Sequence, residues 1–303
     1  MRKTVLNQVL AGLAVSVCVL SGASSASAST SSDDPSVEVL DQLNAVAPEV
    51  ASEIVAGDSS STDDGSAAAV VTEDTLTLTS EVGSFELKAP GVNGNEAVEP
   101  FVLDDASAMF AIRLNNADAA RNYDFEITTA DDVTGTIMKN GGVIFTNTAG
   151  EAVGVVAAPW AKDAAGKDIP TWFTLKDGVL TQSVDVDSVE NVVYPVIADP
   201  YAGQYLVQSA WVTWQPGNSG YVVHAVPSAI GTQVQDQAFL GEWTKDLKTK
   251  LGSNAYLVSS SIENQYHCHV IYTTWGGGGP TWDMESWRPD IWWWVQAAAG
   301  CNP

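Results

Sequence analysis

Residues 75–79 have the sequence TLTLT, and residues 123–127 have the sequence YDFEI. Polar and apolar side chains alternate in both stretches, and this period of two is typical of β-strands with one buried face. Turn residues at 140–142 and 177–178 separate further runs of the same kind. An antiparallel sandwich or barrel-like sheet fits strands at this density, and we predict a β-sandwich-like module over residues 70–200.

A helical pattern precedes this module. We expect the apolar face of this helix to pack on the neighbouring domain, although an amphipathic helix can also bind a partner helix. Pro48 is expected to break it into two pieces, because proline lacks the backbone N–H. Residues 57–69 are rich in Ser, Asp, Gly and Ala and are interpreted as a linker. The apolar stripe recurs at steps of three and four, at Leu40, Leu43, Ala47, Val50 and Ile54.

The amino terminus has the pattern of a signal peptide over residues 1–28. Arg2 and Lys3 precede an apolar run at 9–20, and small residues at 26–28 supply a cleavage site. The run is shorter than the roughly 20 apolar residues that span a bilayer. We therefore expect a secreted protein, extracellular or associated with the cell wall, without a transmembrane segment after cleavage.

Charge is distributed unevenly along the 303 residues, which have a formal net charge of −24. Residues 29–200 contain 7 basic and 30 acidic residues, whereas residues 201–303 contain 4 and 7. Nine of the eleven tryptophans also lie in the later part. This shift indicates a domain boundary near residues 199–200, and the acidic surface argues against nucleic-acid binding. The predicted organisation is a tail with helix and linker at 29–69, the β module at 70–200 and a Trp-rich α+β domain at 201–303.

The C-terminal part contains both the period of two that is typical of strands and the steps of three and four that are typical of helices. Strands are predicted at 205–214 and 221–226, and a helix at 234–251 with Leu240, Trp243, Leu247 and Leu251 on its apolar face. Residues 265–275 alternate, so we predict a strand with Tyr266, Cys268, Val270 and Tyr272 buried. Residues 289–299 are predicted as a short helix, because Pro289 and Gly300 suit its two ends. Its expected inner residues are Ile291, Trp294, Val295 and Ala298.

The mature chain retains two cysteines, Cys268 and Cys301. Pairing is the default in an oxidising compartment, so we predict one disulfide. It closes a loop of about 33 residues, which corresponds to a stabilisation of roughly 3 to 4 kcal/mol in the chain-entropy model.

Two resemblances accompany these patterns. The stretches PWAKDA at 159–164 and YPVIADP at 194–200 resemble a β module that precedes other domains in large secreted actinobacterial proteins. Residues 201–303 resemble the bacterial domain-of-unknown-function family 2599, found at the C-terminus of secreted proteins. Asp283 stands where Asn is expected, and the 292–294 tryptophan run is heavier than usual for the family. The matching residues are Gln265, Tyr266, Cys268, His269, Trp282, Asp283, Met284, Glu285, Trp287, Arg288, Pro289, Cys301, Asn302 and Pro303.

Two histidines are the best candidates for metal ligands. On the predicted strand, His267 and His269 project to the same side and could hold one zinc ion, with His224, Asp283 or Glu285 as a third ligand. Histidines satisfied within a fold are far commoner, so we predict no cofactor. No nucleophile-elbow, zincin or phosphate-loop signature is present in the sequence.

Glu285 and Arg288 could act as an acid/base and an anion clamp, although a structural ion pair explains their spacing with fewer assumptions. Three consecutive helical residues span about 200°, so Trp292 or Trp293 must lie partly outside the core. With Trp287 and Arg288 they are candidates for contact with a partner, although packing beneath the β domain is an equal alternative.

These features favour a secreted noncatalytic binding or interaction protein. In this interpretation the acidic β module presents the disulfide-braced Trp-rich domain to an unidentified extracellular protein or cell-surface glycan. The alternatives are a secreted hydrolase, metal-dependent or acid/base, and an antibacterial effector.

Overall fold

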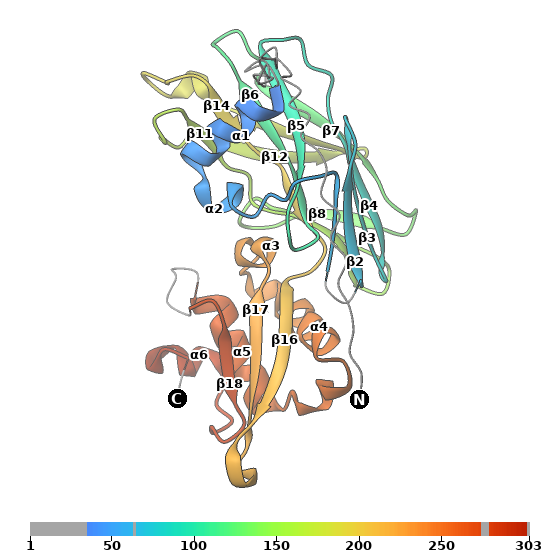
Figure 1. Cartoon of the computed structure of the whole chain (residues 1–303), viewed down its shortest axis with the longest axis vertical. Coiled ribbons are helices and arrows are strands. Elements are labelled where there is room, and N and C mark those ends of the chain that lie inside the picture. The colour runs from blue at the N-terminus through green and yellow to red at the C-terminus, as the bar shows by residue number, and fades with distance from the viewer. Residues whose placement is uncertain (1–34, 63–64, 274–278, 302–303) are drawn as a thin grey trace, which may run out of the picture. The chain divides into compact units, whose positions relative to one another are not determined.

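The structure is a computed structural model that describes residues 35–62, 65–273 and 279–301. The predicted signal peptide at 1–28 lies outside the described residues. In the part that is described, the strands form three antiparallel sheets of seven, eight and three strands (Figure 1). The predicted fold class, mainly β with an α+β C-terminal region, is confirmed.

The first sheet contains the alternating sequences. Leu76 and Leu78 are fully buried, and the threonines beside them are not. The hairpin at Asp177 and Gly178 has φ values of 51° and 79°, and positive φ at both positions is what a two-residue type I′ turn requires. The seven strands, in spatial order, are β1 (Ser59–Ser61), β2 (Ala67–Val71), β3 (Thr75–Ser80), β4 (Gly83–Lys88), β7 (Asn122–Thr128), β13 (Val179–Val184) and β12 (Thr171–Lys176).

The second sheet packs face to face on the first. Phe85 and Phe145 lie with their ring centroids 4.7 Å apart, and Phe110 and Phe125 5.5 Å apart, so aromatic pairs join the two sheets across a hydrophobic core. The predicted sandwich-like module is therefore confirmed. In spatial order its strands are β11 (Ala161–Asp163), β14 (Val196–Ala198), β6 (Ala108–Leu114), β15 (Tyr201–Gly203), β10 (Ala152–Val156), β9 (Val143–Thr146) and β8 (Thr134–Ile137), with β5 (Glu96–Val102) also paired to β6.

The predicted linker at 57–69 is wrong over its described residues. β1 and β2 pair antiparallel, with Ser59 opposite Val70, and they form one edge of the first sheet. Ala67 and Ala69 are buried, because small side chains fit where β2 approaches the core. A segment rich in small and polar residues is thus able to form a short edge strand as well as a flexible linker.

The helical pattern before the module is confirmed. It forms α1 (Pro35–Val46) and α2 (Pro48–Ala51), divided where Pro48 was expected to break it. Val39, Leu43 and Ala47, spaced by four residues, are buried in a hydrophobic cluster with residues of the second sheet, and α1 contacts β5, β6 and β14. The helix therefore rests on its own neighbouring sheet.

The C-terminal region combines the third sheet with helices. The four stripe residues predicted from Leu240 to Leu251 are all buried, but the helix is shorter than predicted, since residues 234–236 belong to no helix and a separate 3₁₀ turn occupies residues 237–239. The third sheet consists of β16 (Val207–Trp214), β17 (Tyr221–Pro227) and β18 (Trp282–Glu285). The helices are α3 (Ala229–Gln233), α4 (Leu240–Leu251), α5 (Ser260–Tyr272) and α6 (Trp293–Gln296), and the short 3₁₀ turns are η1 (Val186–Ser188), η2 (Pro216–Asn218), η3 (Gln237–Phe239), η4 (Gly252–Leu257) and η5 (Ala297–Ala299).

The chain remains in the second sheet beyond the predicted boundary at 199–200. β15 pairs with β6 and β10, so the sheet ends only at Gly203. Leu206 then donates its backbone N–H to Asp246 of α4 at 2.6 Å, and burial raises the pKa of this carboxyl to about 7. The division into domains at this point stays a prediction.

Asp199 lies fully buried at the end of β14. Its Oδ1 accepts the Trp160 backbone N–H at 3.0 Å and the Gln182 side-chain N–H at 3.1 Å. Burial raises the pKa of Asp199 from 3.8 to about 7. Between these values the folded chain holds a proton that the unfolded chain releases, so this contribution to stability is complete below pH 3.8 and is lost as the pH rises through 7.

Asp199→Asn removes that titration and keeps an oxygen acceptor. We expect the free energy of unfolding of the variant to fall less than that of the wild type between pH 4 and 8, at about 1.4 kcal/mol for each unit of pKa shift. Urea denaturation at several pH values measures the difference, with the exposed Asp177→Asn as control. Parallel pH profiles for the Asp199→Asn variant and the wild type would contradict the buried proton.

Candidate functional site

Residues 265–272 form part of helix α5, and the prediction of a strand at 265–275 is wrong. Ser259 caps the helix, since its side chain accepts the backbone N–H of Ile262. The expected buried positions Tyr266, Cys268 and Val270 are indeed buried, which is why the alternation resembled a strand. However, Gln265 and His269 are buried too, so α5 has one wide buried face.

The helix separates the two histidines of the proposed metal site. Residues two positions apart on a helix point about 200° from each other. His267 Nε2 lies 2.7 Å from Thr244 Oγ1, whereas His269 is buried and stacks on Trp282 with 6.1 Å between the rings. Burial lowers the pKa of His267 and lowers that of His269 to about 4. The shared ligand geometry is therefore wrong, and the described residues contain no group of three or more Cys, His, Asp or Glu side chains placed to hold a metal ion.

The predicted disulfide is confirmed. Cys268 and Cys301 are bonded, with their Cα atoms 5.5 Å apart, and both are buried. The bond joins the buried face of α5 to the chain that follows α6. The C-terminal segment is thus held against a helix, where a strand was expected.

Gln265 has a role that sequence reasoning missed. Its side chain is fully buried beside the edge strand β18, where its Nε2 donates to the Glu285 carbonyl at 3.1 Å. Its Oε1 accepts the Glu285 backbone N–H at 2.9 Å. One primary amide therefore satisfies both backbone groups of Glu285, as a neighbouring strand would. A buried Gln on an apolar helix face is the signal that could have indicated this contact.

The tryptophan run is anchored to the start of α5. Asp290 accepts hydrogen bonds from Ser260 Oγ at 2.5 Å and Asn264 Nδ2 at 2.9 Å. Asn264 in turn accepts the Trp293 backbone N–H at 3.2 Å. These contacts place the beginning of the run beside the first turns of α5, and the regular helix α6 covers only four residues.

The inner face predicted for 289–299 is wrong in part. Trp294 and Val295 are 51% and 53% exposed, and Gln296 is the buried residue. Trp292 is 63% exposed, as its candidacy for binding requires, but Trp293 is half-buried beside Tyr272. Trp292 and Trp294 stack nearly parallel, with ring centroids 5.0 Å apart and 15° between the planes. The exposed aromatic pair is therefore Trp292 with Trp294.

A pocket of about 380 Å³ adjoins Trp292. Its walls combine an indole surface with two carboxylates, an amide, a hydroxyl and an imidazole. The lining residues include Ser260, Glu263, Asn264, His267, Asp290 and Trp292.

Glu285 and Arg288 form a mutual ion pair, and Trp287 between them is 51% exposed. The hydrogen bond to Glu285 raises the pKa of the Arg288 guanidinium. The backbone carbonyl of Arg288 also accepts Ser261 Oγ of α5 at 2.9 Å. These contacts join the segment after β18 to helix α5. They agree with the structural ion pair that was considered for Glu285 and Arg288.

The outer face of the third sheet brings His224 and Asp283 together. Trp211, His224 and Asp283 occupy directly opposite positions on β16, β17 and β18. His224 Nδ1 lies 2.7 Å from Asp283 Oδ1, and its Nε2 lies 2.7 Å from Thr213 Oγ1. The imidazole stacks on Trp211 at 4.9 Å. Both predicted strands alternate, so their pairing could have indicated the shared face; the register could not be derived.

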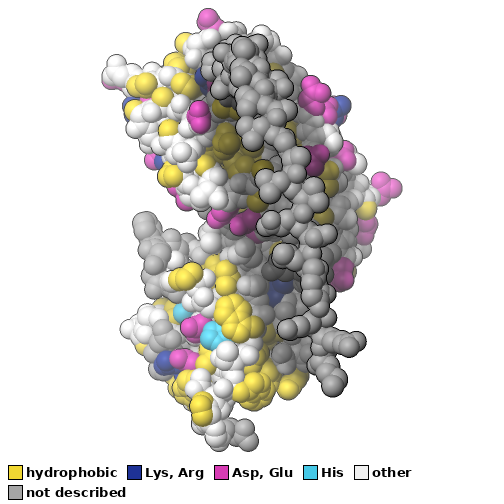
Figure 2. Space-filling view, viewed as in Figure 1, with side chains coloured by type: hydrophobic (Ala, Val, Ile, Leu, Met, Phe, Trp, Pro, Cys, Tyr) yellow, Lys and Arg dark blue, Asp and Glu magenta, His cyan; other side chains and the backbone are white. Residues whose placement is uncertain are grey.

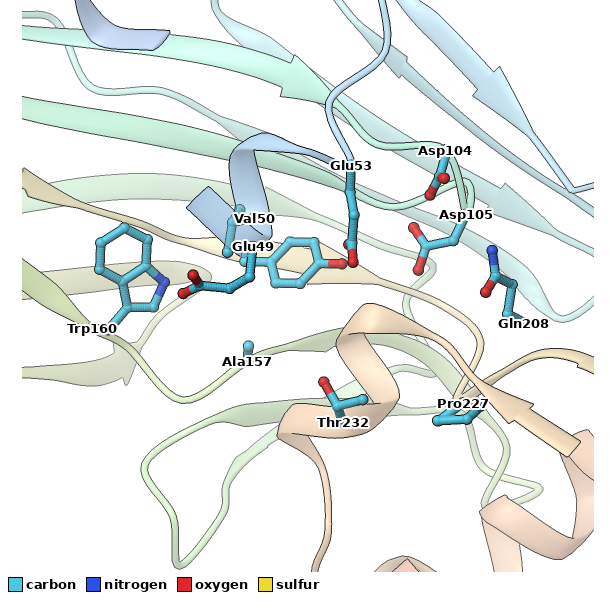
Figure 3. Close-up of a pocket in the computed structure, with 11 residues that line it drawn as sticks. Glu49, Val50, Glu53, Asp104, Asp105, Ala157, Trp160, Gln208, Pro227 and Thr232 are labelled. Carbon is cyan, nitrogen blue, oxygen red and sulfur yellow. The ribbon is translucent and has the colours of Figure 1, made fainter. Parts of the chain in front are cut away.

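A second pocket, of about 280 Å³, collects acidic side chains that are far apart in the sequence (Figure 3). Glu49 and Glu53 come from α2 and the turn after it, and Asp104 and Asp105 from the turn between β5 and β6. Burial, reinforced by the neighbouring Asp105 and Asp104 carboxylates, raises the pKa of Glu53 to about 7. Sequence reasoning missed this pocket because no motif spans its parts.

Residues 207–303 match the model of a family described as a protein of unknown function, DUF2599. The C-terminal region is therefore a DUF2599 match. The resemblance inferred from its motif residues is confirmed, whereas the resemblance of the β module stays a prediction. A search of curated proteins gave no match.

The motifs of the DUF2599 region meet around α5. Trp282, which begins one motif, lies with its ring 5.9 Å from that of Tyr266 and 5.4 Å from that of Trp243. Gln265 binds the backbone at Glu285, and the disulfide brings in the third motif. These residues therefore build the core of the C-terminal region. Among the described residues, no helix has the length and apolarity needed to cross a membrane.

Removing the disulfide tests its contribution to stability. We expect the Cys268→Ala, Cys301→Ala double variant to unfold with about 3 to 4 kcal/mol less free energy, because the unfolded chain regains the entropy of a 33-residue loop. Guanidinium denaturation measures this loss, and reduced wild type serves as the second reference. Two freely alkylatable thiols in the native, unreduced protein would contradict the bond.

Replacing Gln265 tests the side-chain contact with β18. In Gln265→Met the Glu285 N–H loses its partner and the Glu285 carbonyl keeps only the Arg288 backbone N–H, so we expect about 1 to 3 kcal/mol of destabilisation. Hydrogen exchange of the Glu285 backbone amide should also accelerate by more than the decrease in the free energy of global unfolding explains. Gln237→Met, at an exposed position, is the matched control. Equal stability of the two variants would be inconsistent with the contact.

Proposed function

We propose that the protein is a secreted binding protein whose DUF2599 region binds a glycan in the extracellular space or at a cell surface. The amino-terminal pattern of a signal peptide supports export. The disulfide supports it further, since such bonds persist in oxidising compartments. The acidic β module acts as a soluble carrier for the C-terminal domain in this proposal.

One observation carries the choice of a binding role: the exposed stack of Trp292 and Trp294 beside a polar pocket. Large exposed aromatic surface is costly to leave in water, and it is typical of surfaces that contact a ligand. Trp292 stacks on Trp294 and is 63% exposed, so it offers indole surface to a ligand, while Trp294 also contacts Trp293 at 5.4 Å. Asp290 and Asn264 keep the run close to α5, so the platform is positioned by the fold.

A glycan suits this combination better than a purely apolar partner. A pyranose ring has an apolar C–H face that packs on an indole, while its hydroxyls need donors and acceptors at the rim. Glu263, Asp290 and Asn264 provide such groups in the adjoining pocket. Carboxylate and amide oxygens accept more than one hydrogen bond, so existing contacts to Asp290 leave capacity for a hydroxyl donor.

The metal-dependent hydrolase considered as an alternative loses its ligand pair, since His267 and His269 point to different sides of α5. No described contact favours an antibacterial effector.

The experiment measures binding of the full mature chain to purified cell-wall peptidoglycan, chitin and cellulose by sedimentation. Titration with soluble oligomers of N-acetylglucosamine, followed by tryptophan fluorescence, gives the affinity. We expect at least one polysaccharide to remove the protein from the supernatant. Trp292→Ala should lose affinity tenfold or more, because the stacking surface is removed.

The control is Trp172→Ala, which removes a similarly exposed tryptophan from β12. It should bind like the wild type. Equal capture of the wild type and the Trp292→Ala, Trp294→Ala variant, or no capture of the wild type by any polysaccharide, would refute glycan binding at this platform.

A further inference from the structure

The outer face of the third sheet carries a chain of three hydrogen-bonded side chains that glycan binding does not use. We infer that Thr213, His224 and Asp283 form a histidine-activated hydroxyl that cleaves carboxylic esters. Figure 2, in the same view as Figure 1, shows histidine surface beside acidic and hydrophobic surface over these strands. The site lies on different elements from the tryptophan stack and is independent of it.

The contacts determine which ring nitrogen carries the proton. An ionised Asp283 only accepts hydrogen bonds, so the 2.7 Å contact requires a proton on His224 Nδ1. In the neutral imidazole, Nε2 then has a lone pair, and the contact at 2.7 Å must be donated by the Thr213 hydroxyl. The hydroxyl proton therefore already points at a base, and a carboxylate stands behind that base. This is the arrangement by which hydroxyl nucleophiles are activated.

The sheet holds the three groups in place. Asp283 is directly opposite His224 in the register of β17 and β18, and Thr213 lies diagonally across on β16. Trp211 covers one face of the imidazole, with 15° between the two planes, and so restricts its rotation. Positions on strands are held more rigidly than positions on loops, as a catalytic arrangement requires.

Accessibility distinguishes this chain from a similar contact elsewhere. His267 also lies 2.7 Å from a threonine hydroxyl, but that residue, Thr244, is buried. Thr213 is exposed, and the side chain of Asp283 is 53% exposed, so a substrate can approach the hydroxyl from solvent. Water can reach the exposed Thr213 hydroxyl and Asp283 carboxylate, so the hydrogen bonds of these two groups to His224 add little to stability.

The reaction follows from these positions. Thr213 Oγ1 attacks the ester carbonyl carbon while its proton moves to His224 Nε2, and Asp283 stabilises the imidazolium. The ester C–O bond then breaks, the alkoxide takes the proton from Nε2, and an acyl-threonine remains. Water attacks the acyl carbon and gives a proton to Nε2. The bond from the acyl carbon to Oγ1 breaks, and Oγ1 is reprotonated, so ester and water yield acid and alcohol.

The surroundings indicate the class of ester. Trp211 is 43% exposed immediately beside the base, and it offers an apolar surface for the acyl part. The face is open, so it does not require a small alcohol part. Esters of apolar or aromatic acids on a larger carrier are the expected substrates.

The first test is covalent labelling of the full mature chain. A fluorophosphonate probe should add one phosphonyl group at Thr213, located by peptide mass spectrometry, and the protein should hydrolyse p-nitrophenyl butyrate. Thr213→Val keeps the shape and β-branching of the side chain while it removes the hydroxyl. We expect this variant and His224→Gln to lose about 100-fold or more in kcat/KM and to lose the label.

Asp283→Asn keeps the Thr213 hydroxyl, but its kcat/KM should fall at least tenfold, since the amide no longer stabilises an imidazolium. Thr181→Val is the matched control, because Thr181 is a strand threonine whose hydroxyl bonds Asp124 at 2.6 Å without a histidine. It should behave like the wild type. Absence of label from the wild type, label at another residue only, or equal hydrolysis by Thr213→Val would overturn the assignment.

Discussion

The bond between Cys268 and Cys301 constrains everything that follows β18. It connects a buried position of α5 to the end of the segment that carries Trp287 and the exposed aromatic pair. This segment contains only one short α-helix and a 3₁₀ turn, and isolated helices of this length do not form in water. Its conformation therefore depends on being tied at its far end and bonded through Asp290 near its beginning.

Helix α5 links both proposed activities to one core. Its first two turns hold the aromatic run through Ser260 and Asn264, and its buried face supports β18, the strand from which Asp283 projects. The binding platform and the hydrogen-bonded chain on the sheet are thus separate surfaces of one packed unit. Many of the residues that carry the resemblance to the family are buried, and they form the scaffold on which the exposed groups are carried.

The sequence predicted the parts of the fold whose periodicity has a single explanation. The TLTLT and YDFEI stretches alternate over one buried face, and the Asp177-Gly178 turn admits few conformations, so strands and hairpin were correctly predicted. The strand prediction for residues 265–272 was wrong because helix α5 is buried over a wide face. Its buried residues include Tyr266, Cys268 and Val270, which alternate as the buried residues of a strand do. The disulfide was predictable because the predicted mature chain keeps two cysteines and the signal-peptide pattern indicates an oxidising compartment.

The candidate sites were harder to predict, because they depend on register and on contacts distant in sequence. His224 and Asp283 were both recognised as chemically relevant, but only the pairing of β16, β17 and β18 joins them to each other and to Thr213. The acidic pocket likewise draws on α2, on the turn before β6 and on residues further along the chain. Alternation and motifs contain no information about such distances.

The contact of Gln265 with the edge of the third sheet has a consequence for contacts between molecules. An edge strand exposes unpaired backbone groups on which a strand from another molecule can align, and repetition of that event leads to fibrils. At Glu285 both outward groups of β18 are occupied by a side chain of the same molecule. An incoming chain would have to displace a fully buried amide before it could pair with β18 at Glu285, so this glutamine blocks extension of the sheet at that position.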